Sequence, residues 1–509
     1  MNHWNSGYTT DVDYTYGYYP ELSPVRARLA MLDAGFDFPE MATACELGFG
    51  QGISVNIHAA GAPVHWHGTD FNPAQAGFAR QLAAASGARA SLHDDAFDEF
   101  MARDDLPEFD FIGLHGIWSW VSEENRKTLV DFVRRKLKVG GVLYVSYNTL
   151  PGWAAFAPMR HLLALHAEVL GAPGRGSLAR VGDALGFAEK LLEAKPLYAA
   201  LNGGIAQRLA KMKEQNPRYL AHEFFNRDWA PMYFSEVSEW LAAAKVEFAC
   251  SANFSDHVNA LNLTQEQQQF LSTIEDRVFR ESVRDFMVNH QFRKDYWVRG
   301  ARRLSPLERT ERLRAQGVVL LTAKADIKLE FSGTLKVEAN EALYGALLDA
   351  LSDGAPHTLG QLEQNLRGKL TLAQVLEAAM LLISAGHLGV VQSSEAIQAA
   401  RPHTDRLNAY LQQQARGSGD INYLVSPVTG GAISAPRVHQ LFLLAHGHGQ
   451  KSPEDWARFV WRLFSAQGGR MVVGGKRLES AEENIAELTR QAAAFQAVRL
   501  PMLEALGVV

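Results

Sequence analysis

The chain has 509 residues, of which 47% are hydrophobic and 21% are charged, a composition typical of a globular protein with several domains. The formal net charge of −6 gives the chain as a whole no electrostatic reason to bind nucleic acid or an anionic membrane. The two cysteines, Cys45 and Cys250, provide neither a disulfide framework nor a CxxC pair, so no metal site is predicted.

The first residues lack the basic start and apolar run of a signal peptide. No segment approaches the ~20 apolar residues needed to cross a bilayer. We therefore expect a cytoplasmic protein without membrane insertion.

Residues 8–19 are rich in tyrosine and show no helical period. Because tyrosine combines a large apolar ring with a hydroxyl group, this segment can form a lid over a bound ligand, with Tyr16 as the candidate contact. Docking onto the surface of the core is the alternative.

Residues 23–155 alternate short apolar strands with helices. This alternation predicts a parallel sheet with helices on both faces, in which ligands bind beyond the carboxyl ends of the strands. A later strand at 246–250 and a hairpin partner at 296–299 are expected to complete the sheet. The first five strands are expected at residues 43–45, 64–69, 90–93, 109–114 and 142–147, and the helix before the last of these over 122–137.

The rest of the chain is expected to be mainly helical. The segment 317–331 alternates apolar and polar residues like a strand pair, and the helices and closing strand after it resemble a winged helix. That region has more acidic than basic residues, which argues against DNA binding. We therefore predict an α/β fold, with a Rossmann-like core (1–155 and 222–303), a helical insertion (156–221), a winged-helix-like middle domain (304–400) and a mostly helical C-terminal domain (401–509).

A glycine-rich turn, Glu46 to Gly52, follows the first strand. Gly48 and Gly50 match the start of the dinucleotide fingerprint GxGxxG, but position 53 is Ile, and the third glycine, Gly52, comes one residue early. The acid two places before the first glycine suits S-adenosylmethionine, which has a cationic amine and no pyrophosphate. A plain strand-to-helix turn remains the alternative for this loop taken alone.

Two further acids end the next two strands. Asp70 is placed to accept hydrogen bonds from both ribose hydroxyls, and Asp95 from the adenine amino group. Each acid alone is more often a helix cap or a solvated turn, but acids at three successive strand ends predict an S-adenosylmethionine-dependent methyltransferase. The candidate cofactor contacts are Tyr16, Glu46, Gly48, Gly50, Gly52, Asp70, Phe71, Asp95, Ala96 and His115.

The fourth and fifth strands end in residues 115–120 and 147–153, which should face the methyl acceptor. Their aromatic side chains suit a cation or a planar group, although ordinary packing explains Trp118, Trp120 and Trp153 equally well. His115 can act as a general base, a cofactor contact or a turn residue, and we favour the cofactor contact. The candidate catalytic residues on these strands are His115, Trp118, Tyr147 and Asn148.

Several stretches together resemble the class I methyltransferases that carry a methyltransferase regulatory domain: residues 8–24, 46–52, 115–121, 222–226, 231–234 and 289–300. The best understood members are bacterial protein-lysine methyltransferases that act on an outer-membrane surface protein. The resemblance covers residues 8 to about 303 well and the C-terminal third loosely. It implies a protein substrate methylated on lysine, a homodimer formed through the insertion at 156–221, and a wide substrate cleft.

A lysine acceptor must lose a proton before it reacts, because its pKa is near 10.4. The site must therefore lower that pKa by desolvation or pass the proton to His115, Glu223 or water. Two alternatives remain: methylation of a hydroxyl on a small molecule or sugar, which needs a base within hydrogen-bond reach, and a non-catalytic, cofactor-binding regulatory protein.

Overall fold

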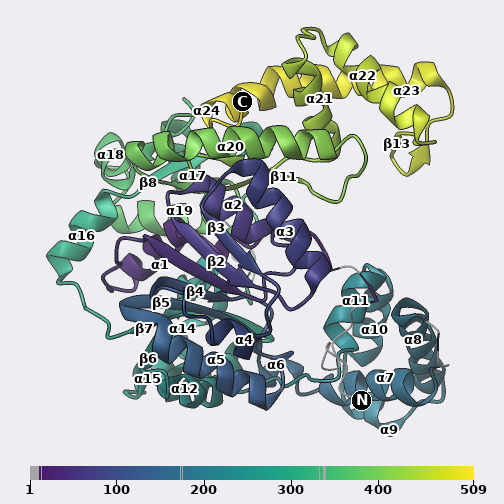
Figure 1. Ribbon diagram of the computed structural model, residues 1–509. Coiled ribbons are helices and arrows are strands. Elements are labelled where there is room, and N and C mark those ends of the chain that lie inside the picture. Colours follow the sequence, from purple (N-terminus) through teal and green to yellow (C-terminus); the bar gives the residue numbers. More distant parts are fainter. Residues whose placement is uncertain (1–10, 13, 172–173, 175, 332, 336–339) are drawn as a thin grey trace.

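The computed structural model describes residues 11–12, 14–171, 174, 176–331, 333–335 and 340–509. A seven-stranded sheet lies at the centre, with the strand order β3-β2-β1-β4-β5-β7-β6 (Figure 1). Strands β1 to β5 run parallel, and β7 is antiparallel to both of its neighbours. The strands are β1 (Thr43–Leu47), β2 (His65–Thr69), β3 (Ala90–His93), β4 (Phe109–Leu114), β5 (Leu137–Asn148), β6 (Val246–Ser251) and β7 (Phe292–Arg299).

Helices cover both faces of this sheet, so the central strands are apolar on both sides. All six residues of β4 are buried. Short polar side chains cap some of these helices: the Asn72 side chain accepts from Ala74 N, and the Ser122 side chain accepts from Asn125 N. The elements of this part are η1 (Pro20–Leu22), α1 (Pro24–Asp33), α2 (Ile53–Gly61), α3 (Pro73–Ser86), α4 (Phe97–Met101), α5 (Glu123–Lys136), α6 (Leu150–Trp153), α12 (Phe234–Ala242), η2 (Phe254–His257), α13 (Asn259–Asn262), α14 (Gln265–Ser272) and α15 (Arg277–Val288).

The predicted parallel sheet and its antiparallel closing hairpin are confirmed. The start of the fifth strand is wrong by five residues, because β5 begins at Leu137 instead of residue 142. Leu137 pairs with Phe109 of β4, and a register shift follows before the regular ladder resumes. Because Leu137 already pairs with β4, α5 ends at Lys136, and Gly140 and Gly141 lie within the strand.

Five helices form an insertion between α6 and α12, which stands apart from the sheet (Figure 1). They bury a core of their own, including Leu163 at 1% exposed, although α7 and α9 leave other leucines at the surface. The predicted boundary at residue 221 lies inside the last of these helices, so the insertion ends at Phe224. The helices are α7 (Ala157–Val169), α8 (Ser177–Glu193), α9 (Leu197–Leu201), α10 (Ile205–Lys213) and α11 (Pro217–Phe224).

The middle region combines helices with a three-stranded sheet of order β10-β8-β9. The strand pair expected over 317–331 is wrong: only residues 317–320 form a strand, and a short helical turn follows. Strand β8 already pairs with β10 on one edge and β9 on the other, so the next residues have no free edge to join. The elements are α16 (Pro306–Arg314), β8 (Gly317–Leu320), η3 (Lys324–Asp326), α17 (Glu341–Ala350), β9 (His357–Thr358), α18 (Leu359–Asn365), α19 (Leu372–Ser384) and β10 (Leu388–Val391).

The C-terminal region is mostly helical, as predicted, with two hairpins that the sequence did not reveal. Its first helix, α20, packs over α2 and α3 (Figure 1), and its start at Ser394 shows that the boundary expected at residue 400 lies inside a helix. The elements are α20 (Ser394–Gln414), β11 (Tyr423–Ser426), β12 (Gly431–Ser434), α21 (Arg437–Gly447), α22 (Pro453–Ala466), β13 (Val472–Val473), β14 (Lys476–Arg477), α23 (Ala481–Ala494), η4 (Phe495–Arg499) and α24 (Leu500–Ala505).

Within the residues that the structure describes, no helix is both long and apolar enough to cross a membrane. The cytoplasmic location stays a prediction.

The C-terminal region docks tightly against the end of α2. The Gln392 side chain donates to the carbonyl oxygens of Gly61 at 2.7 Å and Pro427 at 2.5 Å. A Cβ at position 61 would lie 2.7 Å from the carbonyl carbon and oxygen of Gly430. Only glycine at position 61 therefore allows this backbone contact.

We expect Gly61→Ala to destabilise the protein, because overpacking against a backbone typically costs about 1–3 kcal/mol. Gly77→Ala in α3 is the matched control: nothing lies within 4 Å of a Cβ there, and alanine in a helix is more stable than glycine by roughly 0.5–1 kcal/mol. Thermal unfolding should show a lower Tm for the first variant and an equal or higher Tm for the second. Equal Tm values for Gly61→Ala and the wild type would contradict the docking.

Candidate active site

The glycine-rich loop turns the chain from β1 into α2. Gly48, Gly50 and Gly52 have φ values of 73°, 57° and 70°, a region that side chains with a Cβ rarely adopt. A Cβ on Gly52 would lie 2.4 Å from the Cβ of Ala79, so this glycine serves the close packing of α2 against α3. A Cβ on Gly48 would meet the Ile117 side chain after β4.

Two carboxyl groups are buried beside this loop. Glu46 is 2% exposed, and its Oε2 has no partner in the described part of the chain. Asp70 is 7% exposed, and it accepts from the backbone N–H of Gly50 at 2.8 Å and of Asn72 at 3.0 Å. Burial raises the pKa of Asp70 to about 7, and burial together with the nearby Asp70 raises the pKa of Glu46 well above its usual range. A cationic group with hydroxyl donors fits this pair, because it would favour the ionised carboxylates.

The third strand end is more exposed. The Asp95 carboxylate forms an ion pair with Arg103 at 3.1 Å, and its side chain is 26% exposed. The backbone N–H of Ala96 donates to the Glu99 side chain at 2.9 Å. Phe71 is half-buried after β2. These residues lie at the expected edge of the sheet. The Asp95 carboxylate already pairs with Arg103, and the Ala96 N–H already donates to Glu99.

The tyrosine-rich segment lies over the loop and the end of β4. The Tyr14 ring is close to Gly50, where a Cβ would come within 3.2 Å of it. Tyr19 stacks on His115, with ring centroids 3.6 Å apart. Tyr16 instead packs edge-on against Phe78 of α3, with centroids 5.4 Å apart. Tyr14 and Tyr19, which the sequence did not single out, are therefore nearer to the loop and to His115.

The same segment is tied to the insertion. The Asp11 carboxylate accepts from Ser177 N at 2.8 Å and Oγ at 2.6 Å, at the start of α8. The carbonyl oxygen of Val12 lies 3.0 Å from His222 Nε2 on α11. The segment thus bridges the glycine-rich loop and the insertion.

A cavity of about 840 Å³ opens between the carboxyl ends of the sheet strands and the insertion; we call it the acceptor cavity. Aromatic rings, side-chain amides and basic groups line its walls. Its lining includes Tyr14, Tyr19, His115, Trp120, Asn148, Trp153, Arg208, Lys211, Tyr219, Glu223, Asn289, Gln291, Phe292 and Lys294.

Three of the five candidate catalytic residues line this cavity: His115, Asn148 and Glu223. Trp118 is fully buried and packs against Trp240 of α12 instead. Tyr147 is also fully buried, and its hydroxyl donates to Asp295 at 2.6 Å. Successive residues of a strand point to opposite faces, which separates Tyr147 from the neighbouring Asn148.

His115 and Asn148 present neutral polar groups. Burial lowers the pKa of His115 to about 3, so its ring is uncharged at neutral pH, and its Nδ1 lies 2.8 Å from the Tyr144 hydroxyl. Asn148 Oδ1 accepts from Trp153 Nε1 at 3.0 Å. Asn148 Nδ2 is buried without a partner among the described residues, which leaves a donor for a bound group.

Glu223 contributes a carboxyl group to the cavity wall. Burial raises the pKa of its carboxyl to about 7, although the charges of Arg160 and Arg208 act in the opposite direction. The Arg208 guanidinium lies 4.1 Å from the centre of the Trp153 ring. Sequence reasoning missed Arg208 and Lys211; Lys294 lies in the stretch 289–300 that carried the family resemblance.

The turn before β7 is held by a buried cluster of charges. Arg293, at 2% exposed, forms ion pairs with Asp285 at 2.6 Å, Asp295 at 2.8 Å and Glu281 at 3.1 Å. This cluster fixes the segment that carries Gln291 and Lys294 to the cavity.

Comparison with known proteins gives consistent matches. The family described as a predicted methyltransferase regulatory domain matches residues 216–299. An uncharacterised protein of Synechocystis sp. is 40% identical over 512 residues, which cover 99% of each chain. An uncharacterised protein of Rickettsia prowazekii is 28% identical over 264 residues, 51% of this chain and 46% of that protein.

The structure of PKMT2 from Rickettsia typhi in complex with AdoHcy shares the fold, with a TM-score of 0.68 at 18% identity over 95% of this chain and 98% of that one. The chain therefore belongs to one family with the Synechocystis protein, carries a match to the methyltransferase regulatory domain over residues 216–299, and has the fold of PKMT2.

Proposed function

We propose that this protein transfers the methyl group of S-adenosylmethionine to the amino group of lysine side chains in a protein. One observation carries the proposal: the acceptor cavity joins the glycine-rich loop, through Tyr14, to an aromatic wall around Glu223. Ring faces attract an ammonium group, and a carboxyl with a pKa near neutrality can take up its proton. The likeness to PKMT2, whose structure contains AdoHcy, supports the same cofactor.

Glu46 and Asp70 would hold the cofactor. The unpartnered Oε2 of Glu46 can accept from a cationic amine, and Asp70 keeps lone pairs for ribose hydroxyls beside its two backbone bonds. When bound, S-adenosylmethionine supplies a methyl group on a positively charged sulfur. The three neighbouring glycines keep side chains out of the turn that these acids face.

Cofactor affinity should rise with pH, because the ionised form of Asp70 accepts hydroxyl donors better than the protonated form. Its pKa near 7 places the change between pH 6 and pH 8, and a single proton limits it to tenfold per pH unit. Calorimetry with S-adenosylhomocysteine should show roughly tenfold tighter binding at pH 8 than at pH 6.

Asp70→Asn should weaken binding and flatten this dependence, because the amide cannot ionise. Asp94→Asn is the matched control, since Asp94 is an exposed partner of Arg80 at the neighbouring strand end. A wild-type affinity that stays constant from pH 6 to pH 8 would show that Asp70 does not ionise on binding.

The acceptor cavity can prepare a lysine for attack in two ways. Arg208, Lys211 and Lys294 line it, and cations together with burial lower the pKa of an incoming ammonium group. Glu223 can then accept the proton. The neutral amine would then have a lone pair to attack the methyl group that the cofactor supplies, and the methylated nitrogen would take over the positive charge that the cofactor gives up.

Glu223→Gln should lower kcat on a lysine-containing protein about hundredfold at pH 7, the low end of general-base effects. The loss should shrink at pH 9–10, where more of the lysine is already neutral. Cofactor affinity should not change. Mass spectrometry of protein mixtures incubated with isotopically labelled cofactor gives both the acceptor and the rate.

Glu189→Gln is the control within the same insertion, because Glu189 is a surface residue paired with Lys213 at 2.6 Å. Label found on a hydroxyl group of a small molecule would replace the lysine proposal with the other enzymatic alternative. Cofactor binding without any transfer of label would indicate a regulatory protein.

We also propose a homodimer formed through the insertion. In and next to α7 and α9, the insertion carries apolar side chains that the described part of the chain does not cover. A monomer rarely exposes such a concentration of leucines without a partner, and a two-fold contact would bury the same residues from both copies. They are Leu165 at 41% exposed, Val169 at 66%, Leu170 at 65%, Leu197 at 71% and Leu201 at 76%.

Sedimentation at micromolar concentration should give about twice the 56.2 kDa of one chain. Val169→Glu with Leu201→Glu should produce a folded monomer, because two charges would be buried at the contact. Val139→Glu should leave the dimer intact, because Val139 is also exposed, at 79%, but lies in β5 and not in the insertion. A wild-type monomer would refute the dimer.

A further inference from the structure

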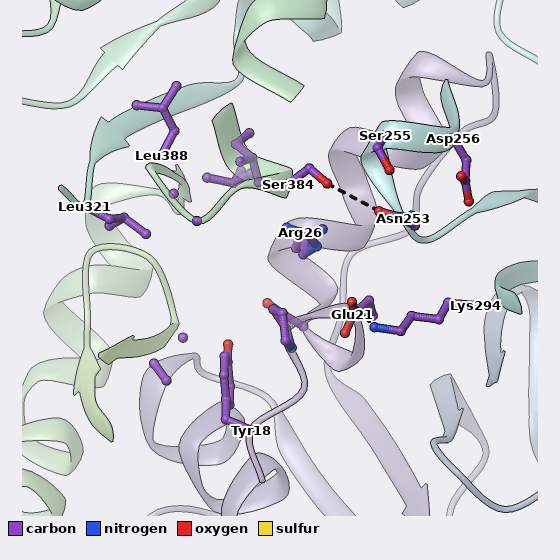
Figure 2. A pocket seen from close by; sticks show the side chains of 18 of the residues that line it. Tyr18, Glu21, Arg26, Asn253, Ser255, Asp256, Lys294, Leu321, Ser384 and Leu388 are labelled. Atoms are coloured by element: carbon purple, nitrogen blue, oxygen red, sulfur yellow. Dashed lines mark hydrogen bonds and ion pairs between the residues drawn. The ribbon is translucent and has the colours of Figure 1, made fainter. Parts of the chain in front are cut away.

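A second cavity, of about 820 Å³, lies where the core, the middle region and the C-terminal region meet (Figure 2). We call it the junction cavity. It is walled by η1 and α1, the segment before β7, the end of α19 with β10, and β12. Its polar and charged lining includes Glu21, Arg26, Asn253, Asp256, Lys294, Ser384 and Arg499.

The junction cavity adjoins the acceptor cavity at the start of β7. Asn289, Gln291, Phe292 and Lys294 line both. A polypeptide whose lysine enters the acceptor cavity can therefore lay its neighbouring residues along the junction cavity. An extended chain advances about 3.3 Å per residue, so several residues on one side of the lysine would lie there.

Arg26 occupies an unusual electrostatic position in this cavity. It lies in the first turn of α1, a helix without an acid in that turn and without a side-chain bond from its N-cap, Ser23. The helix N-terminus already carries a partial positive charge, so a cation there is disfavoured unless an anion is close. Its Nε is buried without a partner among the described residues, and its guanidinium lies 4.2 Å from the centre of the Phe254 ring.

The acids of the same cavity make no direct ion pair with Arg26. The charge of Glu21 attracts Arg26, but the Glu21 carboxylate accepts from Lys294 at 2.6 Å, and Asp256 accepts from Ser251 at 2.7 Å. In the part of the chain that the structure describes, no carboxylate forms an ion pair with Arg26. Figure 2 shows Arg26 between Glu21 and the hydrogen-bonded pair Asn253–Ser384. The guanidinium fork is thus free to bind a carboxylate through two parallel hydrogen bonds.

We propose that Arg26 selects acceptor proteins by binding the carboxylate of a glutamate or aspartate that lies near the methylated lysine in their sequence. This inference rests on the proposed lysine methyltransferase function and names a specificity-determining residue for it. A carboxylate fits better than a phosphate, because Glu21 and Asp256 would repel a doubly charged group more strongly. Asn253 and Ser384 can bond the peptide backbone beside it.

The test uses peptides that contain one lysine and one glutamate, placed from two to eight residues before or after it, each with a glutamine-matched counterpart. Against the wild-type protein, glutamate at one position or two adjacent ones should lower KM roughly tenfold relative to glutamine, as expected for a charged hydrogen bond. The value of kcat should not change. Fluorescence anisotropy of the same labelled peptides measures binding without turnover.

Arg26→Gln should abolish the difference between glutamate and glutamine peptides, and Arg26→Lys should retain part of it. Arg28→Gln is the matched control, because Arg28 is an exposed residue of the same helix that does not line the cavity. Equal Tm values and equal S-adenosylhomocysteine affinities would establish that the variants are folded. A glutamate preference that survives in Arg26→Gln, or no preference in the wild type, would overturn the inference.

The two proposals can fail separately. If glutamate peptides bind in an Arg26-dependent way but receive no methyl group, the role of Arg26 stands and the lysine methyltransferase function fails. If glutarate raises the Tm of the wild type but not of Arg26→Gln, while peptides show no glutamate preference, the site takes a small free carboxylate and the inference about acceptors is overturned.

Discussion

Arg293 is 2% exposed, and the carboxylates of Asp285, Asp295 and Glu281 lie within 3.1 Å of its guanidinium. Burying a lone charge costs several kcal/mol, so this arginine can be buried only where the end of α15 and β7 bring the acids together. The cluster therefore specifies how the antiparallel strand enters the sheet. The turn that it holds, residues 289–292, lines both the acceptor cavity and the junction cavity.

The glycine-rich loop and the acceptor cavity differ in the charged groups that surround them. Beside the glycine-rich loop, Glu46 and Asp70 are buried, form no ion pair with another described residue and have raised pKa values. Across the acceptor cavity, Arg208 and Lys211 add positive charge to the lining, and the charge of Arg208 acts on Glu223. Such opposed environments fit the proposed transfer of a methyl group from a cationic donor to an amine that must first lose its proton.

The remaining regions constrain access to these sites. The insertion supplies one wall of the acceptor cavity, and Asp11 connects the tyrosine-rich segment to it through Ser177. The C-terminal region is fixed to the end of α2 by the glycine contact at residues 61 and 430. Because β12 and α19 close the junction cavity, parts of the chain that carry no recognisable motif still shape what can reach the acceptor cavity.

The sequence alone determined the parallel sheet, the closing hairpin and the positions of Glu46, Gly48, Gly50 and Asp70, because strand periodicity and the turn after β1 are local properties. Tertiary structure decided the rest. In the folded chain, Trp118 and Tyr147 are buried, and Gly52 allows α2 to pack closely against α3. Tyr14 and Lys294 line the acceptor cavity. These outcomes depend on contacts between residues far apart in the chain, such as Tyr147 with Asp295, and no local pattern encodes which distant partner a buried polar group will find.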